Sequence, residues 1–211
     1  MNTIGIIDYG MGNLGSVTNA CRFLDLPAVI VASPDDLPGC ASLILPGVGA
    51  FGDCMTHLRD HGFVDPLRDW IQADRPFLGI CLGLQVLFEG SEESPRAEGL
   101  GVLPGVVKRF DLPIDYKIPL IGWSRVHQKS ADCPLFRGIP EESYFYFVHS
   151  YYADAAAAEY AAGVTRHGVD YASAIWRNHL MAVQFHPEKS QQLGLRMLLN
   201  FAHWTGEEHD E

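Results

Sequence analysis

The chain has 211 residues, 47% of them apolar, so it can bury a sizeable core and is not an intrinsically disordered protein. Its formal net charge is −11, and no cluster of lysine and arginine interrupts this charge, which argues against a nucleic-acid partner. No apolar run approaches the roughly 18 residues of a membrane span, and the first residues lack the features of a signal peptide. We therefore expect a soluble, cytoplasmic protein that makes no use of a membrane.

The cysteines predict free thiols. They are odd in number and none has Cys-x-x-Cys spacing: Cys21, Cys40, Cys54, Cys81 and Cys133. This pattern favours neither a disulfide framework nor a zinc site. We expect at least four of them to be small apolar residues in a reducing compartment, and we expect no metal or cofactor.

Strand and helix signals alternate through the first half of the chain. Short apolar runs predict strands at 4–7, 29–31, 43–45 and 77–80. Helical spacing of apolar residues predicts helices that begin near Val17 and at Asp65-Pro66, with Asp65 as the cap, and a further helix over 82–88. This alternation predicts an α/β fold: an open, mostly parallel sheet with helices on both faces.

The second half is richer in β-strand signals. We expect strands at 102–110, 120–127, 144–152, 160–166, 172–176 and 180–185. A final helix should carry Leu193, Met197, Phe201 and Trp204 on one side. A short alanine run at 155–158 predicts a loop or one helical turn. The chain is expected to form one domain over 3–204, followed by an acidic, flexible tail over 205–211.

Cys81 is the candidate nucleophile. The segment Gly79-Ile80-Cys81-Leu82-Gly83 has the form Gly-x-nucleophile-x-Gly at a predicted strand-to-helix junction, as in a nucleophile elbow. The glycines give room for a tight, strained turn, and the following helix would favour the thiolate. The N–H of Leu82 would then point to where an oxyanion forms. The alternative is a buried cysteine between two packing glycines.

His186 and Glu188 are the candidate base and its orienting carboxylate. They follow the last predicted apolar strand, and residues two apart on an extended segment point to the same side. Glu188 could therefore accept a hydrogen bond from His186, which would fix the imidazole and stabilise its protonated form. The alternative is a surface turn. Because both motifs end apolar strands, and functional groups gather at the carboxyl ends of strands in such sheets, the pair favours a cysteine-dependent enzyme.

At this point the sequence resembles a known family. Gly-Ile-Cys-Leu-Gly-Leu-Gln around Cys81 and the His-Pro-Glu-Lys-Ser segment from His186 are similar to class I glutamine amidotransferases. Further segments at 8–13, 45–51 and 146–151 resemble the glutaminase subunits of imidazole glycerol phosphate synthase. The resemblance covers nearly the whole chain, from about Ile4 to Trp204.

The resemblance implies hydrolysis of glutamine to glutamate and ammonia through a thioester on Cys81. It implies that Gly47, Val48 and Gly49 form the segment that stabilises the oxyanion with a backbone N–H. Gln85, one helical turn after Cys81, would help to hold the substrate. The segment His149, Ser150 and Tyr151 would lie along the glutamine pocket.

The resemblance also implies a partner. Relatives pass ammonia to a (β/α)8-barrel synthase subunit, whose presence switches on the glutaminase, and Trp123 and Tyr146 fall in segments used at that interface. One stretch departs from the family pattern: Ile121-Gly122-Trp123-Ser124 stands where Met-Gly-Trp-Asn is usual, so serine replaces asparagine. This departure leaves room for a paralogue that supplies a different synthase. Two further alternatives are a non-catalytic subunit that regulates its partner and a cysteine peptidase or thiol hydrolase.

Overall fold

The structure is a computed structural model that describes residues 3–153 and 159–204. The alanine run at 155–158 and the acidic tail over 205–211 lie outside the described residues. The helices are α1 (Leu14–Phe23), α2 (Phe51–Asp60), α3 (Val64–Gln72), α4 (Leu82–Gln85) and α5 (Gln191–His203). Short 3-10 turns are η1 (Pro34–Gly39), η2 (Pro134–Phe136) and η4 (Pro187–Lys189).

Five parallel strands form the part of the main sheet that carries the site. They lie side by side in the order β2 (Ala28–Val31), β1 (Ile4–Ile7), β3 (Ser42–Gly47), β4 (Phe77–Cys81) and β13 (Leu180–Val183). The carboxyl ends of β3, β4 and β13 therefore meet at one edge of the sheet.

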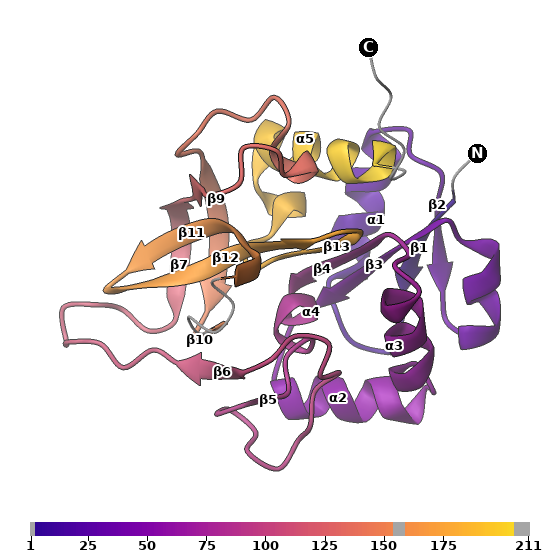
Figure 1. Ribbon diagram of the computed structural model, residues 1–211, viewed down its shortest axis with the longest axis horizontal. Helices are drawn as coiled ribbons and strands as arrows, with labels where there is room; N and C mark the ends of the chain where they lie inside the picture. Colours follow the sequence, from indigo (N-terminus) through magenta and orange to yellow (C-terminus); the bar gives the residue numbers. More distant parts are fainter. Residues whose placement is uncertain (1–2, 154–158, 205–211) are drawn as a thin grey trace.

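Two hydrophobic cores cover the two faces of this parallel sheet. One core contains buried residues of α2 and α3, and the other contains buried residues of α1 and α5. Figure 1 shows the same division, with α1 and α5 on one side of the strands and α2 and α3 on the other. The predicted α/β fold, with helices on both faces of a mostly parallel sheet, is confirmed.

Mostly antiparallel strands extend the sheet beyond β13. Next to β13 follow β12 (Val169–Arg177), β10 (Tyr151–Ala153), β6 (Val106–Arg109) and β5 (Gly90–Ser91), while β11 (Ala161–His167) pairs with β12 and β8 (His127–Gln128). A separate two-stranded sheet joins β7 (Leu120–Arg125) to β9 (Tyr144–His149). This β-rich half projects from one end of the parallel sheet (Figure 1).

Several predicted boundaries were wrong, and hydrogen bonds explain the largest error. The helix expected over 82–88 ends at Gln85, because the carbonyls of Val86, Leu87 and Phe88 accept bonds from the segment 100–103 and do not continue the helix. The strand expected over 102–110 is only Val106–Arg109, because Gly101 and Gly105 adopt positive φ and turn the chain.

Other errors concern where elements begin, break or end. Helix α3 begins at Val64, so Pro66 lies within its first turn, where the missing N–H costs nothing. The expected strand over 144–152 breaks at Ser150 into β9 and β10, which belong to different sheets. The strand expected over 120–127 likewise divides into β7 and β8, and α5 ends before Trp204.

Helix α2 was not predicted, although its pattern was present. Phe51, Cys54, Met55 and Leu58 stand at helical spacing, and all four are buried. Among the described residues, no helix has the length and apolar character needed to span a membrane.

Candidate active site

Cys81 lies at the tight turn between β4 and α4. Its backbone has φ 56° and ψ −106°, a conformation that residues other than glycine rarely adopt. Strain of this kind persists only where the surrounding structure enforces it, and it gathers at functional sites. The strained strand-to-helix turn expected at Cys81 is confirmed, although α4 has only four residues and its dipole is smaller than that of the expected helix.

The glycines that flank Cys81 are required by close backbone packing. A Cβ added to Gly83 would lie 2.0 Å from the carbonyl oxygen of Leu45, and one added to Gly79 would lie 2.5 Å from the carbonyl oxygen of Gly83. Neither position could accept a side chain unless the backbone moved. The two glycines therefore allow β3, β4 and α4 to approach one another at Cys81.

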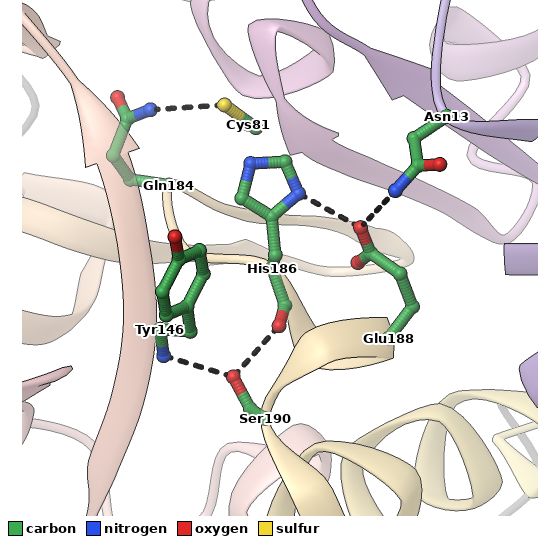
Figure 2. A network of polar contacts seen from close by, with 7 residues as sticks. All are labelled: Asn13, Cys81, Tyr146, Gln184, His186, Glu188 and Ser190. Atoms are coloured by element: carbon green, nitrogen blue, oxygen red, sulfur yellow. Dashed lines mark hydrogen bonds and ion pairs between the residues drawn. The ribbon is translucent and has the colours of Figure 1, made fainter. Parts of the chain in front are cut away.

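His186 follows β13, the parallel neighbour of β4, and so reaches the same sheet edge as Cys81. Its Nδ1 lies 2.8 Å from Oε1 of Glu188, and both side chains are buried. Figure 2 shows the other edge of the imidazole, Nε2, turned toward Cys81, and Nε2 has no other polar partner among the described residues. The structure thus brings the nucleophile, base and carboxylate candidates together. The backbone conformation differs from the prediction, because Glu188 lies on the 3-10 turn η4 and not on an extended segment.

The surroundings of His186 favour its protonated form. Burial is the largest influence and would lower the pKa, but polar and charge interactions with Cys81 and Glu188 together outweigh it and raise the pKa of His186 to about 9. At neutral pH the imidazole therefore holds a proton that it can deliver to a leaving group.

Three side chains that the sequence reasoning did not single out complete this network (Figure 2). Asn13 donates to Oε1 of Glu188 at 3.3 Å, and Gln184 Nε2 lies 3.7 Å from the Cys81 sulfur. Ser190 donates from Oγ to the His186 carbonyl at 2.7 Å. Gln184 and Ser190 flank the His-Pro-Glu segment, so a buried polar residue beside that motif was the available signal. Asn13 lies in the segment 8–13 that carries the family resemblance, but no pattern placed it beside Glu188, 175 positions away.

A cavity of about 370 Å³ opens beside Cys81 and His186. It is lined by most of the predicted oxyanion and substrate residues, namely Val48, Gly49, Leu82, Gln85, His149, Ser150 and Tyr151. The predicted residue Gly47 is not part of this lining, but it lies opposite Cys81 in the β3–β4 register.

Tight packing and an unusual backbone mark the segment that was predicted to stabilise an oxyanion. A Cβ on Gly47 would lie 2.7 Å from Cβ of Leu82, and Gly49 has φ +99°, which favours glycine. Between them Val48 is about one-third exposed, at 36%. Both glycines are therefore required by local geometry.

Gln85 and His149 share one acceptor, the carbonyl of Tyr151. Gln85 Nε2 donates to this oxygen at 3.0 Å and also to Oε1 of Gln184 at 3.0 Å. His149 Nδ1 lies 2.7 Å from the same carbonyl, so this nitrogen carries the hydrogen, and Nε2 accepts from the Tyr171 hydroxyl at 3.1 Å. Burial lowers the pKa of His149 to about 4, which keeps the ring neutral. His149 therefore supports the cavity wall and is no second acid.

Glu93 is a charged cavity residue that sequence reasoning missed. Its Oε2 accepts the backbone N–H of Phe51 at 2.7 Å, at the start of α2. The carboxylate places a negative charge in the lining of the cavity. In the sequence, Glu93 stands next to Glu92 in a short acidic run that is typical of a solvated turn. Only the fold identifies Glu93 as a cavity residue.

Trp123 and Tyr146 do not line this cavity. They lie opposite each other on β7 and β9, with ring centroids 6.1 Å apart, and Trp123 is 45% exposed. Their neighbours Ile121 and Tyr144 are also exposed. The two-stranded sheet therefore presents an apolar outer surface near the site.

Solved structures share this fold. PurLQS from Thermotoga maritima superposes with a TM-score of 0.74 at 15% identity, over 95% of this chain and 97% of that one. The glutaminase domain of CTPS from Trypanosoma brucei, solved with bound acivicin, superposes with a TM-score of 0.66 at 17% identity, over 96% and 94% of the two chains.

Comparison of sequences identifies the family of the chain, which the shared fold alone does not. The family described as glutamine amidotransferase class-I matches residues 6–204. The imidazole glycerol phosphate synthase subunit HisH of Desulfitobacterium hafniense is 49% identical over 97% of this chain and 96% of its own length. The subunit of the same name from Moorella thermoacetica is 47% identical over 95% and 94%. The chain therefore belongs to the class-I glutamine amidotransferase family and, within it, to the group of HisH subunits.

Proposed function

We propose that the chain is the glutaminase subunit of imidazole glycerol phosphate synthase, which hydrolyses glutamine to glutamate and ammonia. The observation that carries the proposal is the juxtaposition of Cys81, His186 and Glu188 at the edge of one cavity. Near-full-length identity to HisH subunits supports the assignment to this synthase.

The first half of the reaction is acyl transfer to sulfur. The Cys81 thiolate attacks the side-chain amide carbon of glutamine, and the carbonyl electrons move to oxygen. When the tetrahedral intermediate collapses, the C–N bond breaks and the His186 imidazolium gives its proton to the leaving nitrogen, which departs as ammonia. Glu188 holds the imidazole through Nδ1 and stabilises its positive charge.

The second half returns the enzyme to its starting state. Neutral His186 takes a proton from water, and the oxygen attacks the thioester carbon. Collapse of this second intermediate releases glutamate and leaves the Cys81 thiolate beside the His186 imidazolium. The raised pKa of His186 suits this resting ion pair.

We assign the remaining glutamine-binding roles to residues of the cavity lining. Backbone N–H groups of Leu82 and of the Val48–Gly49 segment are the proposed oxyanion donors, next to the nucleophile. Gln85, Ser150 and Tyr151 form the proposed substrate wall together with the supporting His149. Glu93 offers its second carboxylate oxygen to the α-ammonium group of the substrate, an opposite charge that a simple amide lacks.

The proposed partner is a (β/α)8-barrel synthase subunit that receives the ammonia. The exposed Trp123 and the half-buried Tyr146 supply the kind of amphipathic side chains that protein interfaces favour. Ser124 follows Trp123 on β7 and pairs with the buried Phe145, so its side chain lies on the opposite face of the strand from Trp123.

Cys81→Ala tests the proposal. The complex with its barrel synthase should lose glutamine-dependent turnover, by at least about a thousandfold, because no nucleophile remains. It should retain turnover with added ammonium salt. Cys21→Ala, which removes a buried thiol on α1, is the matched control and should keep both activities. Loss of ammonia-dependent turnover in the Cys81 variant would contradict the proposed division of labour.

A further inference from the structure

Ser190 stands where a helix cap is expected, but its hydroxyl points elsewhere. It is the N-cap residue of α5, and serine is favoured there because its hydroxyl can accept a free N–H of the first turn. Here the side chain makes no capping hydrogen bond. Ser190 is only 1% exposed, and its hydroxyl points toward Tyr146 and His186 (Figure 2).

The hydroxyl joins two segments that are 44 positions apart. Ser190 Oγ donates to the carbonyl of His186 at 2.7 Å and accepts the backbone N–H of Tyr146 at 2.9 Å. The N–H of His186 in turn donates to the carbonyl of Tyr146 at 2.9 Å. Both backbone polar groups of His186 are thus fixed: one directly on β9, and the other through Ser190.

The surrounding packing holds Ser190 in this orientation. Gly194, in the first turn of α5, lacks a Cβ that would lie 1.9 Å from the Pro187 carbonyl oxygen and 2.8 Å from Cβ of Ser190. The first turn of α5 can therefore press directly against the turn that carries Glu188. The Ser190 hydroxyl adds a second hydrogen bond to the His186 carbonyl, which also accepts the backbone N–H of Lys189 at 3.1 Å, and so braces the turn that carries Glu188.

We propose that Ser190 is a positioning residue for the triad, which ties the His186–Glu188 turn to Tyr146 of β9. The inference rests on the proposed glutaminase function. Ser190 does not contact the reacting atoms; it acts by holding the imidazole of His186 at Cys81.

The test is Ser190→Ala in the complex with the barrel synthase. We expect kcat for glutamine hydrolysis to fall about tenfold, the KM for glutamine to change less than about twofold, and ammonia-dependent turnover to stay at the wild-type level, because only the orientation of His186 is loosened. Ser143→Ala is the matched control. Its buried hydroxyl also donates to a backbone carbonyl, that of Pro140 at 2.6 Å, but on the turn before β9. It should keep the wild-type kcat.

A double-mutant cycle separates positioning from simple stabilisation. If Ser190 acts through the His186–Glu188 pair, Ser190→Ala should lower kcat much less in a Glu188→Gln background than in the wild type. An equal loss in both backgrounds, or a wild-type kcat in Ser190→Ala, overturns the inference while the wild-type glutaminase activity still stands. A wild-type complex without glutaminase activity would instead overturn the proposed function.

Discussion

At the scale of single residues, His186 makes a pH-dependent contribution to stability. Its pKa is about 9 in the folded chain and near 6.5 without the fold, so the folded chain binds the proton more tightly. This stabilisation is full below about pH 6.5 and is lost as the pH rises through about 9. Urea unfolding should show that the difference in free energy of unfolding between wild type and His186→Gln shrinks by up to roughly 3 kcal/mol as the pH rises over this range. A difference that stays constant with pH would contradict the assigned pKa.

The role of Gln184 can also be tested by a single substitution. Gln85 donates to its Oε1, which leaves Nε2 to face the Cys81 sulfur at 3.7 Å. Gln184→Glu removes that donor at nearly constant volume, so alkylation of Cys81 by iodoacetamide should slow by roughly tenfold or more, as expected for a hydrogen bond to a charged group. Gln128→Glu, far from the site on β8, serves as the control. Equal alkylation rates in both variants would exclude a role of Gln184 at the sulfur.

At the scale of elements, the contact between β3 and α4 depends on Gly83. A Cβ there would lie 2.0 Å from the Leu45 carbonyl oxygen, so Gly83→Ala should lower the free energy of unfolding by about 1–3 kcal/mol. Gly15→Ala is the control, since no atom lies within 4 Å of its added Cβ in the first turn of α1. It should be neutral or stabilise by up to about 1 kcal/mol. Urea unfolding of both variants decides, and equal stabilities would contradict the packing described at the elbow.

The elements also show how far sequence patterns reach. Strands β1 to β4 were predicted because a short apolar run is a local signal that needs no distant information. Helix α4 was predicted too long because its later carbonyls accept bonds from the segment 100–103. The break of the 144–152 strand at Ser150 was missed because pairing with two different sheets depends on tertiary structure.

At the scale of the whole molecule, the site is assembled from distant segments. Cys81, His186 and Glu188 could be predicted, since each stands in a recognisable motif at the end of a strand. Asn13, Glu93 and the Ser190–Tyr146 tie could not, because their roles arise from contacts across 175, 42 and 44 positions. Sequence therefore predicts the proposed reacting groups better than the groups that contact them.

We propose that the whole molecule works as a glutaminase under the control of a barrel synthase. The most direct measurement is ammonia release from glutamine with and without the cognate synthase and its nucleotide ligand. We expect weak release by the chain alone and strong release only when both are present. The reason is that the proposed oxyanion donors around Val48 have to be oriented for catalysis by the bound partner. Release that is unaffected by that synthase, or absent in the complete complex, would contradict the account.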